Sequence, residues 1–366
     1  MTDAELRLSC TTHLPGHRQP SPAQLFAAMS AWCEANGVAH DTYGSGALIQ
    51  DFEQKVARLL GFESALFCIT GTMTQATALR IACEERGSRL VALHPTSHIL
   101  RHERGNHQLF DHFQALQIGD QHRPWTLEEL QGIPDKLGAA TLELPMREIG
   151  GQCPSWDELA AIKAYCREQS IHLHLDGARL WETAAAFRRP VGEIAAGFDS
   201  VYVSLYKGIG GMGGAMLLGG AGFTAKAQEW FRRQGGNVYQ RTPYVVAAAM
   251  QFDQRLAAMP ACFRRTEWLY ETLRGYPLLT PNPARPQANM LHLHLPVSRD
   301  RAIEIRNRIA EQHGVWLFNG ASHAALPNRS SVELYVGDNL VNLPDDRLRE
   351  ILTLWSAALA NHAPAN

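Results

Sequence analysis

Between about residues 62 and 220, short apolar runs rich in β-branched and aromatic residues alternate with stretches of helical periodicity. Such alternation is typical of strand–helix–strand units, which build a mostly parallel sheet with helices on its faces. The pattern therefore predicts a doubly wound α/β fold. The expected strands are Ser64–Ile69, Arg89–Leu93, Ala140–Leu144, Ile171–Leu175, Val201–Leu205 and Ala215–Leu218.

One expected helix has a clear start. Ser155 and Glu158 are three residues apart and follow Pro154. This spacing predicts a capping box, in which each side chain bonds a backbone amide at the helix end. The helix is expected to run to about Gln169 and to lead directly into the strand that carries Asp176.

The pattern changes near residue 275. Two helical patterns, Val245–Met259 and Phe263–Arg274, end there, and four prolines between residues 277 and 286 mark a break. We therefore expect a large domain of residues 1–275, with an N-terminal segment 1–40, and a small C-terminal α+β domain of residues 276–366. The expected elements of the small domain are the strands Met290–Leu295 and Val332–Val336 and the helices Arg301–His313 and Asp345–Asn361.

Composition narrows the class of ligand. The 366-residue chain has a formal net charge of −2 at pH 7, which gives no electrostatic reason to expect nucleic acid or an anionic membrane as a partner. A small molecule is the expected ligand. The first residues are acidic without an apolar stretch, and no apolar run approaches the roughly 20 residues of a membrane span. A cytoplasmic location is therefore expected.

Cysteine and histidine spacing gives no metal site. The seven cysteines are scattered and never spaced Cys-x-x-Cys, and no His-Glu-x-x-His pair occurs. Reduced thiols in a reducing compartment are expected.

Two charged residues, Asp176 and Lys207, are about 30 residues apart and lie at the ends of two successive expected strands. Asp176 precedes Gly177, on the same strand face as His172 and His174, and Lys207 ends the next strand. A lysine amine forms a Schiff base with pyridoxal 5'-phosphate, and a carboxylate keeps the pyridine nitrogen protonated so that the ring accepts electrons. Taken alone, Asp176 is as well explained as a helix N-cap, and a lysine at a strand end is usually exposed.

Glycine-rich segments before and after these residues allow two interpretations. Gly71 and Thr72 open a helix after the first expected strand, where free amides and the helix dipole suit a phosphate, although both residue types also cap helices for structural reasons. Gly208-x-Gly210-x-x-Gly213 resembles a dinucleotide fingerprint. A strand is expected after it instead of a helix, which argues against a nicotinamide or flavin site.

The sequence contains five motifs, which are, in chain order, Gly71-Thr72, His98, Glu143, Asp176-Gly177-Ala178-Arg179 and Lys207-Gly208. Together they resemble the threonine aldolase and aromatic β-eliminating lyase family, which has fold type I of the pyridoxal phosphate enzymes. The resemblance covers about residues 40–240. It implies a large domain with a mostly parallel sheet, a small C-terminal domain, and a homodimer or homotetramer whose sites are shared between subunits.

The resemblance also implies roles for single residues. Lys207 would carry the Schiff base, Asp176 would bind the pyridine nitrogen, and Gly71 with Thr72 would bind the phosphate. His98 would stack on the cofactor ring and act as a base.

Further residues are placed near the substrate by the same resemblance. By the resemblance, Arg179 would brace the ring side of the site. Its position alone allows it to pair with Asp176, to reach a substrate carboxylate or to be a solvated helix charge. Tyr43 lies in a segment similar to a family loop near the active site.

The chain departs from the family where the substrate is bound. Ser9 lies in a segment that differs from the family's N-terminal Arg-Ser-Asp-Thr, and Glu333 aligns where an arginine is expected for the substrate carboxylate. Reversing that charge puts this route of recognition in doubt. Arg147 or Arg241 is the expected replacement, unless either is an ordinary surface arginine.

These residues predict a lyase that cleaves the Cα–Cβ bond of a β-hydroxy-α-amino acid to give glycine and an aldehyde. The alternative in the family is β-elimination that releases ammonia and a keto acid; a racemase or aminotransferase would use the same lysine and aspartate. An alternative from another class is a protein that binds the cofactor with a different or lost activity.

Overall fold

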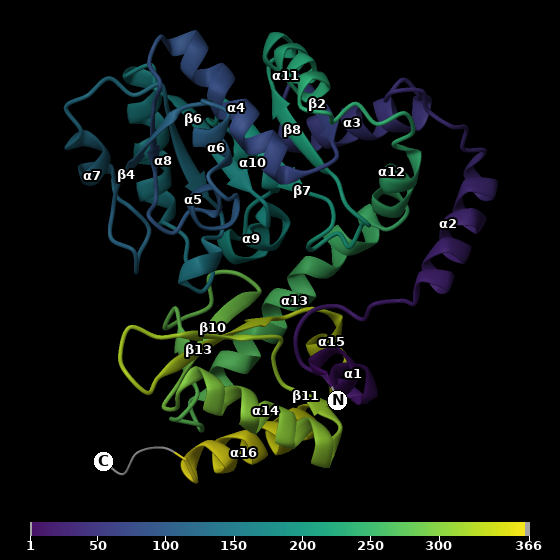
Figure 1. The fold of residues 1–366 in the computed structure, drawn as a ribbon, viewed down its shortest axis with the longest axis vertical. Coiled ribbons are helices and arrows are strands. Elements are labelled where there is room, and N and C mark those ends of the chain that lie inside the picture. Colours follow the sequence, from purple (N-terminus) through teal and green to yellow (C-terminus); the bar gives the residue numbers. More distant parts are fainter. Residues whose placement is uncertain (1, 363–366) are drawn as a thin grey trace. The chain divides into compact units, whose positions relative to one another are not determined.

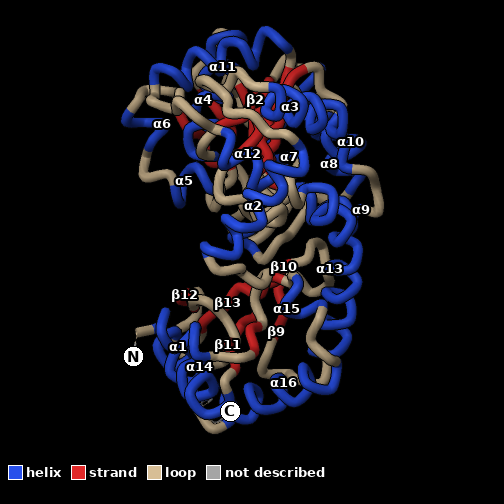
Figure 2. The backbone as a smooth tube through the Cα atoms, turned by 90° about the vertical axis from the view of Figure 1, so that its right-hand side faces the viewer, coloured by secondary structure: helices blue, strands red, loops and turns tan. Residues whose placement is uncertain are grey.

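The computed structural model describes residues 2–362, which form two compact units (Figure 1). Among the described residues, the larger unit comprises residues 20–148 and 152–257, and the smaller unit comprises residues 2–19, 149–151 and 258–362. Each unit has its own sheet, drawn in red in Figure 2. No helix among the described residues is long and apolar enough to cross a membrane.

The larger unit is built on a seven-stranded sheet in the order β2-β8-β7-β6-β5-β3-β4. Only β8 runs antiparallel to its neighbours, so the expected mostly parallel α/β sheet is confirmed. The four central strands are buried along their whole length, as strands covered by helices on both faces must be. The strands are β2 (Ser64–Cys68), β3 (Leu90–Leu93), β4 (Gln114–Gln117), β5 (Ala139–Glu143), β6 (His172–Gly177), β7 (Ser200–Ser204) and β8 (Ala215–Gly219).

Helices cover this sheet and extend beyond one edge of it (Figure 1). α4 packs over β6 and β7, and α3 packs on β2. α2 lies at the margin of the unit, where it contacts α12. The helices are α2 (Pro22–Asn36), α3 (Ala47–Leu60), α4 (Gly71–Arg86), α5 (His98–His102), α6 (Asn106–Leu109), α7 (Leu127–Gln131), α8 (Trp156–Glu168), α9 (Leu180–Phe187), α10 (Val191–Ala195), α11 (Ala221–Arg233) and α12 (Thr242–Ala249).

The smaller unit is an α+β sandwich. Its antiparallel sheet has the order β12-β13-β10-β9, and apolar side chains of β10 and β13 share a core with α14 and α16. The N-terminal segment joins this unit because β1 pairs in parallel with β11. The elements are α1 (Asp3–Ser9), β1 (Thr12–His13), β9 (Thr280–Asn282), β10 (Met290–Leu295), α14 (Arg299–His313), β11 (Val315–Trp316), β12 (Ala321–His323), β13 (Ser330–Tyr335), α15 (Asp338–Val341) and α16 (Asp345–Ala360).

The helices that precede residue 275 differ from the sequence prediction. The chain breaks after α12, and α13 (Phe252–Leu273) then runs without interruption through Pro260. The expected gap between residues 259 and 263 is therefore absent. The two units divide within α13, whereas the sequence pattern suggested a division after residue 275.

Candidate active site

Polar side chains gather at the carboxyl ends of four adjacent strands of the large sheet. Lys207 follows β7, Asp176 lies near the end of β6, Glu143 ends β5 and His98 opens α5 after β3. These strands are neighbours in the order β7-β6-β5-β3. Ligands of open α/β sheets bind outside the carboxyl ends of the strands, so this edge is the expected place for a site.

The larger unit has a cavity at this edge. Five of the residues expected from the sequence line it together: His98, Arg147, Asp176, Arg179 and Lys207. Its remaining lining residues are His102, Glu143, Pro145, Glu148 and Ala178.

The turn after β7 presents Lys207 to the cavity. The backbone N–H of Gly210 donates to the carbonyl of Lys207 at 3.1 Å, and Gly210 has a φ of 82°, a left-handed conformation that glycine adopts without strain. β8 follows the glycines, as expected from the sequence, so they do not open a helix. Burial, with a smaller contribution from the Arg179 charge, lowers the pKa of Lys207 to about 8. A lysine with a lowered pKa is a better nucleophile at neutral pH.

Asp176 is buried, and both of its carboxylate oxygens accept hydrogen bonds. The backbone N–H of Ala178 donates to Oδ1 at 3.0 Å, and Nε2 of Gln75 donates to Oδ2. Asp176 is not the N-cap of the following helix, because α9 has Arg179 at that position. The alternative explanation of Asp176 as a helix cap is therefore wrong.

Glu143 lies beside Asp176, its register partner on the neighbouring strand. Burial, reinforced by the negative charge of Asp176, raises the pKa of Glu143 to about 8. Its Oε1 accepts the backbone N–H of His98 at 2.6 Å. Near neutral pH, Glu143 is therefore mostly an uncharged acid beside a carboxylate.

His98 is oriented by a carboxylate that the sequence analysis missed. Its Nδ1 lies 3.1 Å from Oε1 of Glu103, whose side chain is buried. Burial raises the pKa of Glu103, and the hydrogen bond with His98 opposes that rise.

His102 and Arg147 contact the same carboxylate oxygen at the cavity. Nε2 of His102 lies 3.0 Å from Oε1 of Glu148, and Nη1 of Arg147 donates to the same oxygen at 2.9 Å. His102 is four residues after His98, one turn along α5, and that spacing is the signal that could have identified it.

The expected phosphate loop lies at the start of α4. Thr70 caps the helix by accepting the backbone N–H of Met73 at 3.4 Å. A Cβ added to Gly71 would lie 2.2 Å from the hydroxyl of Tyr202, the register partner of Asp176 on β7. Gly71 thus allows the helix end, with its free first-turn amides, to approach the strand beside Asp176. Gly71 and Thr72 are not among the lining residues of the cavity.

The other three expected site residues lie elsewhere. Ser9 ends α1 in the smaller unit, where its hydroxyl donates to the carbonyl of Leu6 at 2.8 Å. Tyr43 is 49% exposed. Arg241 is buried, and its Nη2 donates to Oδ1 of Asn237 at 2.9 Å. None of the three lines the cavity.

The residues present fit pyridoxal 5'-phosphate. The cavity contains an amine with a lowered pKa and a buried carboxylate whose two oxygens already accept hydrogen bonds. A helix N-terminus suited to a phosphate begins against the strand next to that carboxylate. Lys207, Asp176 and the start of α4 would hold the aldehyde carbon, ring nitrogen and phosphate respectively.

This sheet, with a lysine and an aspartate after adjacent central strands, defines a fold type I pyridoxal phosphate enzyme. The family described as beta-eliminating lyase matches residues 21–296, and the chain belongs to it. Pyridoxal 5'-phosphate, expected from the sequence, is the cofactor of this family, and the family resemblance drawn from the motifs is confirmed.

Individual relatives agree with this assignment. Low-specificity L-threonine aldolase 1 of Arabidopsis thaliana is 26% identical over 306 residues, which cover 81% of this chain and 85% of the relative. A solved structure from Exiguobacterium sp. 255-15, provisionally named aromatic amino acid beta-eliminating lyase/threonine aldolase, is 35% identical with a TM-score of 0.90, covering 96% of this chain and 99% of its own. One from Listeria monocytogenes EGD-E, provisionally named L-allo-threonine aldolase, is 34% identical with a TM-score of 0.90, covering 97% and 99%.

Proposed function

We propose that the protein is an aldolase that cleaves the Cα–Cβ bond of a β-hydroxy-α-amino acid such as threonine, giving glycine and an aldehyde. The observation that supports the proposal most directly is the cavity, which Lys207, Asp176 and His98 line together. Lys207 has a lowered pKa, and His98 is hydrogen-bonded to the Glu103 carboxylate. The relatives named as threonine aldolases support the reaction type.

The chain's own residues divide the reaction between them. When bound, pyridoxal 5'-phosphate supplies an electron sink for the pair left by the broken Cα–Cβ bond. Asp176 holds the proton at the pyridine nitrogen, which keeps that sink effective. Lys207 anchors the cofactor between turnovers and, with a pKa near 8, exchanges a proton at Nζ at neutral pH.

His98 is the proposed base for the β-hydroxyl. Since Glu103 lies at Nδ1, the other ring nitrogen, Nε2, is available to take the hydroxyl proton as the Cα–Cβ bond breaks. The carbonyl that forms leaves as the aldehyde, and a proton returned to Cα completes glycine.

Arg147 is the proposed partner of the substrate carboxylate. It lines the cavity beside His98 and Lys207. A guanidinium binds a carboxylate with two parallel hydrogen bonds, which fixes the orientation of the substrate. The guanidinium of Arg241, the other candidate, donates to Asn237, and Arg241 does not line the cavity. Ser9 and Tyr43 remain predicted substrate residues.

Aldehyde release tests this function. Purified protein with pyridoxal 5'-phosphate is given threonine, allo-threonine or phenylserine, and the aldehyde is measured by coupled reduction with NADH. Aldehyde and glycine in equal amounts are expected. Release of ammonia and a keto acid without aldehyde would instead identify a β-eliminating lyase, and absence of any product would favour a cofactor-binding protein that has lost its activity.

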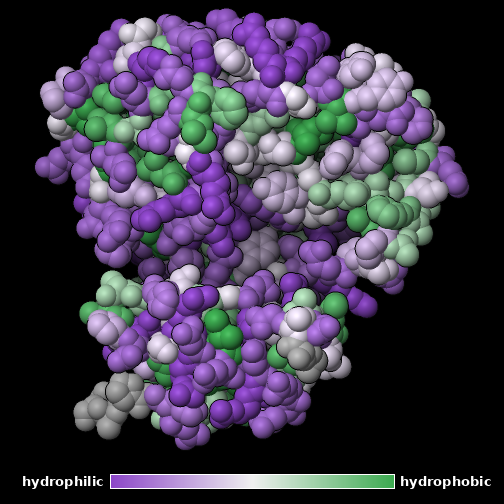
Figure 3. Space-filling model, viewed as in Figure 1, coloured by the Kyte–Doolittle hydropathy of each residue, from purple (hydrophilic) through white to green (hydrophobic). Residues whose placement is uncertain are grey.

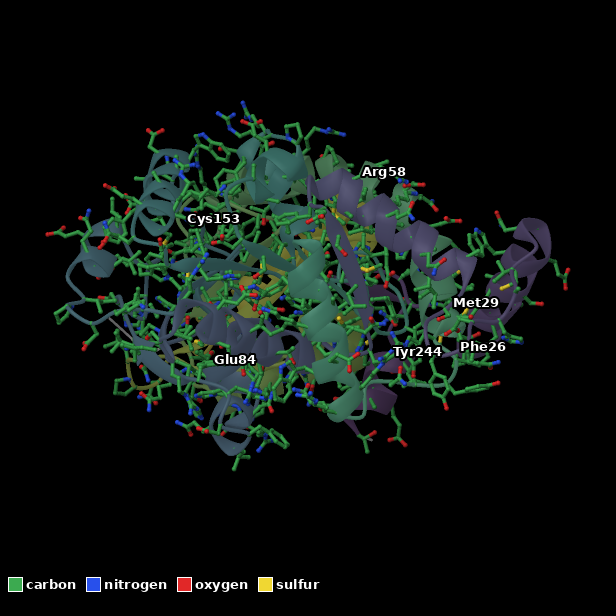
Figure 4. All side chains as sticks on the ribbon, turned by 90° about the horizontal axis from the view of Figure 1, so that it is seen from above. Phe26, Met29, Arg58, Glu84, Cys153 and Tyr244 are labelled. Carbon is green, nitrogen blue, oxygen red and sulfur yellow. The ribbon has the colours of Figure 1, made fainter. Side chains whose placement is uncertain are left out.

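We also propose a homodimer or homotetramer. None of the 15 residues of α2 is buried, although the helix carries Leu25, Phe26, Met29 and Trp32. Hydrophobic residues gather over this helix on the face drawn in Figure 3. Figure 4 labels Phe26 and Met29 on α2 and Tyr244 on α12, the helix that α2 contacts. A second copy that covers this surface would remove apolar area from water.

Light scattering during size-exclusion chromatography tests the assembly. The wild type is expected to elute as a dimer or tetramer, and Phe26→Asp as a smaller species. A monomeric wild type would contradict the proposal. The cytoplasmic location rests on the cysteines, which are all free thiols, and is likewise a proposal.

A further inference from the structure

A row of buried polar side chains lies next to Asp176. Because side chains alternate along a strand, His172, His174 and Asp176 share one face of β6. Ser200 is the register partner of His174 on β7, and Gln75 reaches this face from α4. All five side chains are at most 4% exposed. Buried polar groups at this density require partners.

The five side chains form one continuous hydrogen-bonded series, named here the Asp176 chain. Nε2 of Gln75 bonds Oδ2 of Asp176, and Oε1 of Gln75 lies 2.7 Å from Nε2 of His174. Oγ of Ser200 lies 2.7 Å from Nδ1 of His174 and 2.7 Å from Nε2 of His172. Each hydrogen bond in the series joins two side chains that are buried from water.

The negative charge of Asp176 fixes every hydrogen in this series. An ionised carboxylate only accepts, so Gln75 must direct its amide nitrogen to Asp176 and its oxygen to His174. His174 must therefore carry its proton on Nε2, which leaves Nδ1 to accept the hydroxyl proton of Ser200. The Ser200 oxygen then accepts from Nε2–H of His172. Every donor along the series points toward Asp176.

Burial keeps both histidines in the form that this pattern needs. It lowers the pKa of His174 to about 3 and that of His172 to about 4. Each ring is therefore neutral at physiological pH, with one donor and one acceptor. Hydrogen bonds aligned in one direction polarise one another, so the last donor in the series, Gln75, is strengthened.

Apart from Gln75 and the backbone N–H of Ala178, the side chains around Asp176 include few donors for its charge. Glu143 on β5, Tyr202 on β7, Glu103 after α5 and Lys207 all interact with its charge. Burial raises the pKa of Glu143 to about 8 and that of Tyr202 well above its usual value, so both are mostly neutral at pH 7. Lys207 is the cation among these four. A buried carboxylate needs fixed donors in such surroundings.

We propose that the Asp176 chain is a positioning device, in which Gln75, His174, Ser200 and His172 hold the Asp176 carboxylate ionised and directed at the pyridine nitrogen of the cofactor. The inference rests on the proposed function only for the identity of the group that Asp176 binds. The four residues act through Asp176 and touch neither cofactor nor substrate in this role.

Magnetic resonance of the wild-type holoenzyme labelled with 15N-histidine tests the hydrogen positions, and substitutions serve only to assign the signals. Signals are assigned by their loss in His172→Gln and His174→Gln. Both rings are expected to be neutral and protonated on Nε2 from about pH 6 to about pH 8. A proton on Nδ1 of His174, or a doubly protonated His174 ring, would overturn the inference.

Two substitutions cut the series at different separations from Asp176. Gln75→Met removes the last donor, and Ser200→Ala removes a link two steps further away. The dissociation constant of pyridoxal 5'-phosphate, measured by visible absorption, is expected to rise about tenfold in Gln75→Met and by less in Ser200→Ala. No rise in Gln75→Met would contradict the proposal.

Thr77→Val is the matched control, because Thr77 lies on α4 near Gln75 and bonds Nε2 of Gln234 at 3.1 Å outside the series. It is expected to lower the unfolding temperature and leave the dissociation constant unchanged. An equal rise in all three variants would mean that packing, and not the Asp176 chain, governs cofactor affinity. A wild type that binds no cofactor would refute both proposals, whereas expected tautomers and affinities without aldehyde release would refute only the proposed function.

Discussion

The cavity has a floor and a rim that differ in how their charges are controlled. The floor consists of Asp176, Glu143 and Lys207, where burial sets the pKa of the last two. The rim consists of His98, His102, Arg147 and Glu148, whose side chains are between 32% and 41% exposed. Burial therefore controls the protonation of the floor, whereas the charges of the rim are in contact with water.

This difference assigns the two regions different tasks. Fixed donors and acceptors in a dry site stabilise developing charge without reorganisation, which suits the chemistry at the cofactor ring. Half-exposed ion pairs are screened by water and salt and are worth about 0–1 kcal/mol, so they rearrange easily around a substrate. Substitutions in the floor should thus change the chemical step or the stability, and substitutions in the rim should change substrate affinity.

Lys207→Ala is expected to have the largest effect, because it removes the amine that anchors the cofactor. Aldehyde release should fall at least about a thousandfold, since residues that act as one catalytic unit fail together. Thermal unfolding should be nearly unchanged, because Lys207 lies in a glycine-rich turn outside the hydrophobic core clusters. A variant that retains full activity would refute the role of Lys207.

Glu143→Gln is expected to have the next largest effect, on stability. The folded-state pKa of about 8 lies above the ordinary value of 4.5, so protonation favours the folded state. The stabilisation is fully present below about pH 4.5 and is lost as the pH rises through about 8. Relative to Glu143→Gln, which does not titrate there, the wild type should lose unfolding free energy steadily over this range, by roughly 1.4 kcal/mol for each unit by which the folded-state pKa exceeds the ordinary value.

Denaturant unfolding of both proteins at about pH 5, 7 and 9 checks this expectation. Asp176→Asn in both proteins is the control, because it removes the neighbouring charge that raises the pKa of Glu143. Parallel stability curves would show that the floor does not hold Glu143 protonated.

The strands and the order of the site residues could be predicted from the sequence, because both depend on local patterns. β6 and β7 are short runs of β-branched and apolar residues with polar residues between them, and Asp176 near the end of β6 and Lys207 after β7 occur in the order that the cofactor needs. The strand β4 was missed because Gln114–Gln117 has polar ends and only half-buried residues between them. Its place in the sheet comes from pairing with β3, a contact that sequence periodicity does not contain.

The partners of the site residues could not be predicted, because they come from distant parts of the chain. Gln75 is 101 residues from Asp176, and nothing around it marks it as a hydrogen-bond donor to that carboxylate. The capping box shows the same limit. Ser155 accepts the backbone N–H of Glu158 as expected, but the Glu158 carboxylate accepts the backbone N–H of Leu127 at the start of α7, so only half of the predicted capping box forms. A tertiary contact can thus change the hydrogen-bond partner of a side chain even where the sequence correctly predicts the start of the helix.

Arg147→Ala tests the rim at the proposed carboxylate contact. The Michaelis constant for threonine should rise about tenfold with little change in kcat, because a contact made equally in the ground and transition states affects binding alone. Arg147→Lys keeps the charge but loses the two-pronged geometry, so it should recover only part of the affinity. A fall in kcat with an unchanged Michaelis constant would move Arg147 from substrate binding to the chemical step.

His102→Asn should have the smallest effect, and it is the most direct test of the difference between floor and rim. The substitution removes the contact with Glu148, but both side chains are partly exposed, so the pair contributes at most about 1 kcal/mol. Less than a fivefold change in kcat/KM is expected, with no change in unfolding temperature. The effect should shrink further as salt is raised, since exposed charges are screened. A larger, salt-independent loss of kcat would show that His102 exchanges a proton with the substrate. His102 would then belong with the residues of the floor, which act in the chemical step.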